Sequence, residues 1–421
     1  MEVKPGYKQT EVGGIPEEWE SSKIGDFSFV TKLAGFEYTI HFDYSKSGPV
    51  IAVRALNIKN GTLDLTEVHT IPRKTSDDLP RSKLVKGDLV ISYVGTLGRV
   101  AMIPEDEKFH LAPNVAKICV DKDRVAPEFL AQFLNSFNGQ KLIFDAAAST
   151  TQAALSMGNL RGIFFVRPPL PEQRAIATAL SDVDGLLGGL DRLIAKKRDL
   201  KQAAMQQLLT GQTRLPDFHG EWEVKRLGDV GSTYGGLTGK TKADFGEGPA
   251  RYITFMNVMA NVVIDCETFE PVQVSPTEAQ NRAIKGDLFF NGSSETPEEV
   301  AMCSVLLDEV QGVYLNSFCF GFRFHHDAEA DGLFLAYYLR SKEGRELMKS
   351  LAQGSTRYNL SKVALLKSPL RLPRLLEQTA IASVLTEMDA ELAALTQRRE
   401  KTRALKQAMM QELLTGRTRL V

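Results

Sequence analysis

The chain has 421 residues, of which 43% are hydrophobic and 24% are charged, with 51 Lys and Arg against 52 Asp and Glu. This length excludes a single small module, because it is enough for two or more domains that each bury a core of their own. The composition excludes a disordered or fibrous protein, and the near-neutral charge names no partner by itself. The N-terminus lacks the apolar segment of a secretion signal, and no run approaches eighteen apolar residues, so we expect a cytoplasmic protein.

The first part of the chain, residues 1–168, is predicted to be an α+β domain. Short β-rich runs occupy residues 48–56, 86–94 and 115–121, separated by Gly, Pro, Asn and Asp, as is typical of strands joined by turns. A helix is expected at residues 127–136. Four cysteines in the whole chain lack CxxC or Cys/His spacing, which favours buried structural thiols over a metal site or disulfides: Cys119, Cys266, Cys303 and Cys319.

A long helix follows, within a spacer segment that we place at residues 169–211. Apolar residues alternate steps of four and three and form a narrow seam: Ile176, Leu180, Val183, Leu187 and Leu190. About 38 helical residues would span about 57 Å at 1.5 Å per residue. Gly211 stands where a C-terminal helix cap is expected.

The rest of the chain repeats this organisation. Residues 200–215 read LKQAAMQQLLTGQTRL and residues 405–420 read LKQAMMQELLTGRTRL. With an offset of about 200 residues, EEWESSKIGD matches GEWEVKRLGD, KGDLVIS matches KGDLFFN, and FLAQFLNS matches FLAYYLRS. This indicates an internal duplication rather than a short solenoid repeat. It predicts a second α+β domain at residues 212–373, a second spacer helix at residues 374–421 and pseudo-two-fold symmetry.

The second helix carries a seam with the same steps and a cap glycine, Gly416. The seam consists of Ile381, Leu385, Met388, Leu392 and Leu395. Because a narrow apolar seam must be buried, we expect the two long helices to pair as an antiparallel coiled coil that separates the two domains. Basic and polar residues interrupt both seams, and they form either a solvated turn between two packing faces or a phosphate-facing patch: Lys197, Lys201, Arg399, Thr402 and Lys406.

These motifs resemble the specificity subunit of type I restriction-modification enzymes. The resemblance rests on the WE opening of each copy, the KGDLVIS strand with its GTLGRVAMI turn, and the PPLPEQRAIA start of a helix that ends in LLTG. It implies two target recognition domains that each read one half of a bipartite double-stranded DNA site, with helices that set the unread gap and dock two modification (methyltransferase) subunits. It also implies restriction subunits, which are ATP-dependent translocases and nucleases, and a role in phage defence. S-adenosylmethionine is then expected in the methyltransferase subunits, adenine N6 is the expected target, and no cofactor is expected on this chain.

We expect no catalytic residues and no metal site in the chain itself. GGLTGKT at Gly235 lacks the GxxxxGK[ST] spacing of a phosphate loop, and Tyr234 stands at the required glycine position. RPPL from Arg167 to Leu170 lacks the Asn or Asp and the aromatic residue of an amino-methyltransferase tetrapeptide. His325 and His326 are adjacent, which suits a turn better than a metal site.

DNA contacts are expected in the loops where the two copies diverge most, although unconstrained surface loops diverge in the same way. Three loop classes carry lysines for phosphate contacts and side chains able to bond or stack on bases. The candidates are Lys32, Lys46, Tyr93, Thr96, Arg99 and Gln152 in the first copy, and Lys240, Lys242, Asn291, Ser293, Arg357, Tyr358 and Asn359 in the second.

The starts of the long helices are candidate docking sites for the two partner subunits. The residues are Glu172, Gln173 and Arg174, with the counterparts Glu377 and Gln378. The same Glu-Gln pair can serve as an N-terminal cap. Leu376 replaces Pro171 in the second copy, which leaves open whether both helices start alike. A two-headed scaffold that binds proteins rather than DNA remains the alternative, and the slightly acidic pI of about 6.6 is compatible with it.

Overall fold

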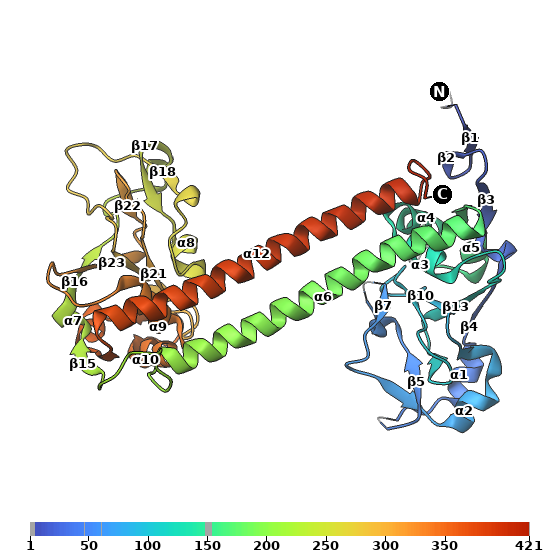
Figure 1. Cartoon of the computed structure of the whole chain (residues 1–421), viewed down its shortest axis with the longest axis horizontal. Coiled ribbons are helices and arrows are strands. Elements are labelled where there is room, and N and C mark those ends of the chain that lie inside the picture. The colour runs from blue at the N-terminus through green and yellow to red at the C-terminus, as the bar shows by residue number, and fades with distance from the viewer. Residues whose placement is uncertain (1–4, 46, 60, 148–153, 421) are drawn as a thin grey trace. The chain divides into compact units, whose positions relative to one another are not determined.

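The computed structural model describes residues 5–45, 47–59, 61–147 and 154–420. The chain divides into two compact units (Figure 1): unit 1 comprises residues 1–191 and 397–421, and unit 2 comprises residues 192–396. Each unit is an α+β domain completed by one half of helix α6 (Leu170–Leu208) and one half of helix α12 (Leu375–Leu413). Among the described residues, no helix is long and apolar enough to span a membrane.

Unit 1 is built on two four-stranded sheets. The first has the strand order β11-β10-β13-β4, and β10 and β4 both run antiparallel to β13. The second has the order β8-β5-β12-β9, with a parallel β5–β12 pair. The strands of the two sheets are β4 (Ser28–Lys32), β10 (Leu89–Ser92), β11 (Val100–Met102), β13 (Val115–Val120), β5 (Val50–Val53), β8 (His69–Ile71), β9 (Lys83–Leu84) and β12 (Phe109–Leu111).

Smaller elements complete unit 1. Three two-stranded ladders join β1 (Tyr7–Thr10) to β2 (Gly13–Pro16), β3 (Glu20–Lys23) to β14 (Phe164–Arg167), and β6 (Ile58–Lys59) to β7 (Thr62–Leu63). The helices are α1 (Gly35–His41), α2 (Arg73–Asp78), α3 (Pro127–Asn135), α4 (Phe137–Ala147) and α5 (Met157–Gly162). The core of the first sheet continues through α3 into both long helices, because Leu130, Ile176, Leu180, Leu413 and Leu414 belong to one buried cluster.

Unit 2 repeats this topology. Its main sheet has the order β16-β23-β19-β21, and β17 pairs in parallel with β22 and antiparallel with β18, as β5 does with its two neighbours. The strands are β15 (Glu223–Arg226), β16 (Gly231–Gly235), β17 (Phe245–Ile253), β18 (Glu270–Val272), β19 (Leu288–Asn291), β20 (Ser293–Ser294), β21 (Cys303–Val305), β22 (Val313–Leu315), β23 (Cys319–Phe324), β24 (Ala352–Gln353), β25 (Tyr358–Leu360) and β26 (Pro369–Leu372). The helices are α7 (Leu227–Val230), α8 (Phe255–Ala260), α9 (Gly332–Arg340), α10 (Lys342–Leu351) and α11 (Lys362–Lys367). The predicted duplication of an α+β fold is confirmed.

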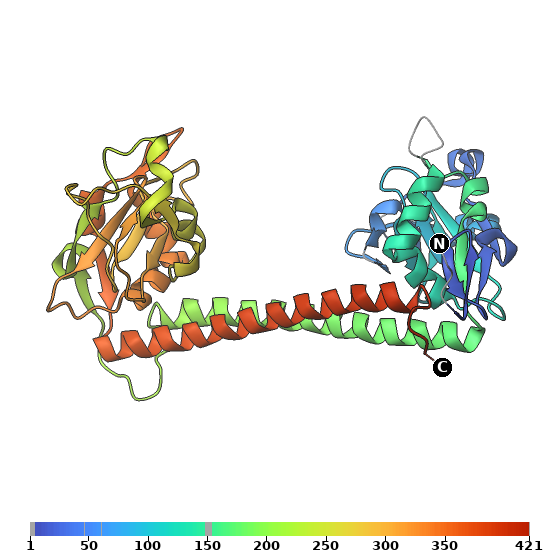
Figure 2. The same ribbon diagram turned by 90° about the horizontal axis from the view of Figure 1, so that it is seen from above.

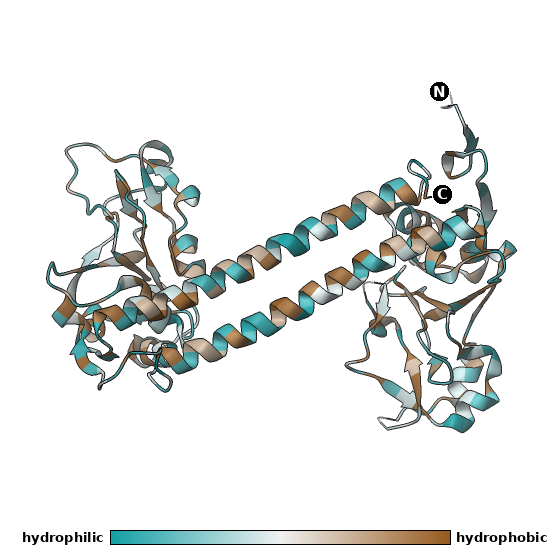
Figure 3. Cartoon of the chain, viewed as in Figure 1, coloured by the Kyte–Doolittle hydropathy of each residue, from teal (hydrophilic) through white to brown (hydrophobic). Residues whose placement is uncertain are grey.

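The residues of the predicted seams are buried or half-buried. Pairing of α6 with α12 does not bury them along their whole length, because the first residues of each seam pack against a domain core instead. Ile176 and Leu180 pack in the main core of unit 1, and Ile381 and Leu385 pack in that of unit 2. Farther along the helices, Leu190 is buried, and Val183, Leu187, Met388, Leu392 and Leu395 are half-buried. The colouring in Figure 3 shows the resulting alternation of hydrophobic and hydrophilic residues along both helices. The start of each seam therefore fixes its helix to a domain.

The basic residues that interrupt the seams form ion pairs between α6 and α12. In unit 1, Lys406 lies 2.7 Å from Asp184 and Arg399 lies 3.4 Å from Asp191. In unit 2, Lys197 lies 2.7 Å from Glu391, and Lys201 pairs with Asp389. In both units, residues later in α6 pair with residues earlier in α12. The segments of the two helices within each unit therefore lie antiparallel (Figure 2). The prediction of a solvated basic turn or a phosphate patch was wrong for these residues, because carboxylates of the opposite helix neutralise them; Thr402 is buried and bonds the Arg398 carbonyl.

The helix starts and ends form one junction in each unit. The Glu172 carboxylate accepts hydrogen bonds from Trp19 Nε1 at 3.0 Å and from Arg419. The Gln173 amide accepts from the Ala126 N–H and donates to the Pro168 carbonyl. In Figure 1 the segment that follows α12 lies beside the start of α6. These contacts join the two ends of the described chain within unit 1.

Unit 2 has an equivalent junction. Arg214 binds the Glu377 carboxylate, and Gln378 accepts from the Asp331 N–H and donates to the Pro373 carbonyl. The exchange of Pro171 for Leu376 therefore leaves the two helix starts alike. Gly211 and Gly416 both have φ +72° just after the helix ends, as the predicted caps require.

The predicted docking role of four residues at these starts was wrong. Glu172, Gln173, Glu377 and Gln378 are each at most 3% exposed, because they satisfy backbone groups and arginines of their own unit. Only Arg174 of that set is exposed.

Candidate DNA interface

The candidate DNA-binding loops leave the same edge of the main sheet in both units. Because β4 and β10 both run antiparallel to β13, their C-terminal ends lie at one edge. The same holds for β16 and β19, which both run antiparallel to β23. The KGDL strands are held in place from the other end. Asp287 accepts from the Ile284 N–H and binds Arg323, while Asp88 accepts from the Val85 N–H and lies 3.6 Å from Lys117.

In unit 1 the structure brings Lys32, at the end of β4, together with Tyr93, which follows β10. The Lys32 ammonium lies 4.9 Å from the centre of the Tyr93 ring, a favourable cation–π geometry. The Tyr93 backbone is fixed on both sides, because its N–H donates to the Asn114 carbonyl and its carbonyl accepts from the Leu155 N–H. Tyr93 is half-buried, so the sheet presents an anchored aromatic face with a cation above it.

The turn after Tyr93 is shaped by two glycines in the left-handed region, Gly95 at φ +78° and Gly98 at φ +81°. Ser92 Oγ closes the turn by accepting from the Arg99 N–H and donating to the Thr96 carbonyl. Thr96 and Arg99 are exposed on this turn. The turn can therefore present a hydroxyl and a guanidinium to a ligand without a loss of core packing.

In unit 2 the corresponding segments form a small sheet in the order β20-β25-β24. Ser293 pairs with Asn359 and Ser294 pairs with Tyr358. Arg357 reaches across this ladder, and its Nε donates to Ser293 Oγ at 3.1 Å. Arg357 and Asn359 are exposed, whereas Ser293 and Tyr358 are half-buried. A guanidinium, an amide, a hydroxyl and an aromatic ring thus meet at one edge, and these are groups that bond base edges or stack on bases.

Two predicted contacts were wrong. Asn291 is fully buried, and its amide donates to the Ser293 and Glu299 carbonyls and accepts from the Met302 N–H, so it shapes the turn and is not open to DNA. Lys240 is held by Glu278 at 2.6 Å with only 6% of its side chain exposed, so it is not free for a phosphate. Lys242 is exposed in the same loop. Lys46 and Gln152 lie outside the described residues.

The three segments that were examined as possible catalytic or ligand-binding motifs make contacts that stabilise the fold. Gly235 ends β16, and the Tyr234 hydroxyl donates to Asp287 at 2.6 Å. Burial, followed by the nearby Asp287 carboxylate, raises the pKa of Tyr234 well above its usual range, so the hydroxyl remains a donor. Arg167 pairs with Glu20 across the β3–β14 ladder. His325 follows β23, and its N–H donates to the Val230 carbonyl.

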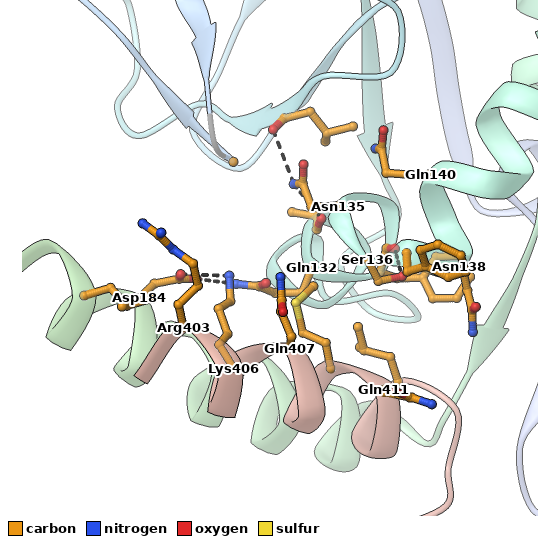
Figure 4. Close-up of a pocket in the computed structure, with 18 of the residues that line it drawn as sticks. Gln132, Asn135, Ser136, Asn138, Gln140, Asp184, Arg403, Lys406, Gln407 and Gln411 are labelled. Atoms are coloured by element: carbon orange, nitrogen blue, oxygen red, sulfur yellow. Dashed lines mark hydrogen bonds and ion pairs between the residues drawn. The ribbon is translucent and has the colours of Figure 1, made fainter. Parts of the chain in front are cut away.

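Sequence reasoning missed a second polar site in unit 1, a cleft between the domain and the two long helices (Figure 4). Gln132, Asn135 and Ser136 line one wall, and Arg403 and Gln407 line the other. The signal that could have found this site was the repeated LKQAxMQ motif, whose exposed glutamines have no role in the core. The Arg419–Glu172 contact was also missed, although TRL occurs at the end of both copies.

Comparisons with known proteins agree with this architecture. The family model described as the type I restriction modification DNA specificity domain matches residues 16–194 and 219–403. Two proteins of Methanocaldococcus jannaschii are similar over nearly the whole chain. One is assigned as the specificity subunit of the type I restriction enzyme MjaX and is 25% identical, with 98% of this chain and 97% of that protein covered. The other, the MjaVIII specificity subunit, is also 25% identical, with coverages of 96% and 94%.

Solved structures share the fold. A type I restriction-modification S subunit from M. genitalium has a TM-score of 0.58 at 15% identity, covering 98% of each chain. The HsdS subunit from Thermoanaerobacter tengcongensis has a TM-score of 0.51 at 18% identity, covering 96% of this chain and 98% of that one. Because the family model matches each of the two α+β domains and their helices separately, the chain belongs to the type I restriction-modification DNA specificity family, with two copies of its domain.

Proposed function

We propose that this chain is the DNA specificity subunit of a type I restriction-modification complex and that each unit reads one half of a bipartite duplex site. The observation that carries the proposal is the repeated sheet edge. Both units present polar, aromatic and cationic side chains at the same end of the main sheet, yet the residues differ: Tyr93, Thr96 and Arg99 in one, Ser293, Arg357 and Asn359 in the other. The same sheet end with different chemistry suits the reading of two different half-sites. Membership of this family favours a DNA-binding function over the function of a protein-binding scaffold.

The chemistry would reside in partner subunits. Two methyltransferase subunits would carry S-adenosylmethionine and modify adenine N6, and restriction subunits would join the complex for cleavage. The chain itself would act in the cytoplasm as a non-catalytic selector. The unread gap would be set by the paired helices, and no cofactor would be bound by this chain.

An exposed face of α6 supports docking of a partner subunit on the long helices. In unit 2, Leu193 and Leu200 are seven residues apart and are 39% and 47% exposed; in unit 1, Leu186 is 45% exposed. Leucines at this spacing form a stripe that a further helix can cover. Arg174 is exposed near the start of the same helix. These residues replace the buried Glu-Gln pairs as the candidate docking surface.

Co-expression with the methyltransferase subunit, followed by mapping of methylated bases across the host genome, tests the proposal. We expect methylation at a two-part motif with a fixed gap, and no such methylation when this chain is omitted. An unchanged methylation pattern after omission would reject it. Insertion of four residues, about one helical turn, into each long helix should lengthen the gap and keep both half-sites.

A matched pair of variants separates docking from folding. Leu186→Gln, Leu193→Gln and Leu200→Gln combined should abolish co-purification of the methyltransferase subunit while the thermal unfolding of this chain stays unchanged. Ser181→Asn, Arg192→Gln and Asp199→Asn, at exposed polar positions of the same helix, provide the control. Retention of the methyltransferase subunit by the leucine variant would remove the stripe as its docking surface.

A further inference from the structure

The cleft in unit 1 has a volume of about 1500 Å³, and Figure 4 shows side chains from its walls. One wall is formed by the β6–β7 hairpin, the end of the β10–β11 turn, and the junction between α3 and α4. The other wall is formed by the parts of α6 and α12 that belong to unit 1 and by the tail after α12. Every lining residue belongs to unit 1.

The lining carries more cations than carboxylates. The cations are Lys59, Arg99, Arg403, Lys406 and Arg417, and the carboxylates are Asp184 and Asp191. Lys406 is paired with Asp184 and Lys59 with Asp64, so the three arginines are the candidate phosphate ligands. Six amides, from Gln132, Asn135, Asn138, Gln140, Gln407 and Gln411, are spread over both walls. Arginine, lysine and the amides of Asn and Gln are the side chains that bind phosphate oxygens in protein–DNA interfaces. The cleft therefore matches a polyanion in charge and in hydrogen-bonding groups.

Two arginines of the lining are exposed and available to a ligand. Arg403 and Arg417 are 52% and 58% exposed, and their carboxylate partners are Glu400 at 3.1 Å and Glu412 at 3.6 Å. Exposed ion pairs of this kind stabilise a protein only weakly, so a phosphate can replace the carboxylate at little cost. Among the described residues, Arg99 makes no ion pair; its guanidinium lies 3.5 Å from the Ile58 carbonyl.

The helix wall is the most faithfully repeated part of the chain. Lys406, Gln407, Met410 and Gln411 have the same residue types as Lys201, Gln202, Met205 and Gln206. The four glutamines are exposed, so core packing does not account for their identity in both copies. The segments that precede this motif in the two helices, residues 192–199 and 397–404, differ at most positions. A ligand that runs past both copies, as duplex DNA does, would account for this identity.

The cleft is continuous with the candidate DNA interface, because Arg99 belongs to the turn after Tyr93 and also lines the cleft. We infer that this cleft binds the sugar-phosphate backbone of the DNA beside the bases that unit 1 reads, as an anchor without sequence preference. This inference rests on the proposed DNA-binding function. It extends the DNA contact of unit 1 from the turn after Tyr93 to the long helices.

The anchor is predicted to be stronger in unit 1 than at the equivalent wall of unit 2. Arg417 corresponds to Gln212, so the second copy lacks one cation at the end of the repeated motif. This difference offers a substitution that the fold already tolerates in its own second copy. Arg417→Gln gives unit 1 the residue type that unit 2 has naturally.

The test uses the full complex with its methyltransferase subunits and a duplex that carries the methylated motif. The binding constant is measured at several KCl concentrations for wild type, Arg417→Gln and Arg403→Gln. Each lost phosphate contact should make the slope of log K against log salt shallower by about 0.9, so the variant's loss of affinity relative to wild type should be about eight-fold larger at 0.1 M than at 1 M salt. Lys141→Gln is the matched control, since Lys141 is an exposed cation of unit 1, ion-paired with Asp145, that does not line the cleft. It should leave the slope unchanged, and the methylated motif should stay the same in all variants.

The outcomes are distinguishable. Unchanged slopes for both arginine variants would overturn the inference. Dissociation of the methyltransferase subunit with unchanged slopes would also overturn it and would assign the cleft to an acidic protein segment. Failure of the proposed function has a different signature, because the wild-type complex would then methylate no two-part motif.

Discussion

Arg419 and Glu172 are separated by 247 positions in the sequence, yet their side chains share two hydrogen bonds, at 2.5 and 2.8 Å. Glu172 is 3% exposed and also accepts from Trp19 Nε1. The tail after α12 is thereby tied to the start of α6. Arg214 and Glu377 repeat the contact in unit 2. In each half of the chain, one Arg–Glu pair therefore connects the segment that follows one long helix to the start of the other long helix.

Removal of Arg419 should destabilise unit 1. Arg419→Ala leaves a buried carboxylate with only the indole N–H as a donor, and we expect a loss on the order of 2 kcal/mol in the free energy of unfolding. Urea unfolding followed by circular dichroism measures it. The control is Glu18→Ala, which removes the exposed second partner of Arg419 and should change stability by less than about 0.5 kcal/mol. Equal effects of the two substitutions would show that the buried contact is not what stabilises the junction.

The buried face of α6 should contribute more to stability than its exposed face. Leu180 is fully buried in the core of unit 1, so Leu180→Ala should cost about 2–5 kcal/mol through lost burial and the cavity left behind. Leu186→Ala on the same helix should cost less than about 0.5 kcal/mol, because Leu186 is half exposed. Thermal unfolding of both variants provides the comparison. Similar losses would contradict the assignment of the two faces.

Two asparagines of unit 2 should have opposite roles. Asn291→Ala removes three hydrogen bonds of a buried amide and should lower the midpoint of thermal unfolding. Asn359→Ala should leave the midpoint unchanged and alter the DNA sequence preference at one half-site, because Asn359 is exposed beside Ser293 and Arg357. A folded Asn359→Ala complex with an unaltered motif would remove this residue from the interface.

The cysteines should react slowly in the native protein. Burial raises the pKa of Cys303 and of Cys319 to about 12, and the pKa of Cys266 to about 11 with a contribution from Asp308. The thiolate is the reactive form, so at pH 8 only a very small fraction of each thiol can react. Labelling with a thiol reagent at pH 8 should be slow before unfolding and complete after it in denaturant. Raising the pH should speed native labelling. Rapid labelling of Cys303 at pH 8 would contradict its burial.

The repeat made much of the fold predictable from one sequence. Residues kept in both copies mark shared structure, as with the KGDL strand, the FLAQFLNS helix and the cap residues Gly211 and Gly416. The Glu-Gln pairs were misinterpreted because sequence spacing placed them on a helix but could not show which face the rest of the chain covers. Lys201 and Lys406 were misinterpreted for a related reason, since their carboxylate partners are on the other long helix.

The candidate interface was predictable as a group of loops and not residue by residue. Asn291 and Asn359 have the same side chain near the same edge, yet one is buried and one is exposed. This difference depends on turn geometry that no short motif specifies. The cleft was missed because its walls come from segments far apart in the sequence.

Independent reading of two half-sites is the central claim, and genome-wide methylation mapping of two variant complexes tests it most directly. One complex carries Tyr93→Ala and Thr96→Ala in unit 1, and the other carries Arg357→Ala and Asn359→Ala in unit 2. Each variant should relax or change only one half of the wild-type motif, a different half in each case, and should keep the gap. Changes in the same half from both variants, or in neither half, would contradict the account.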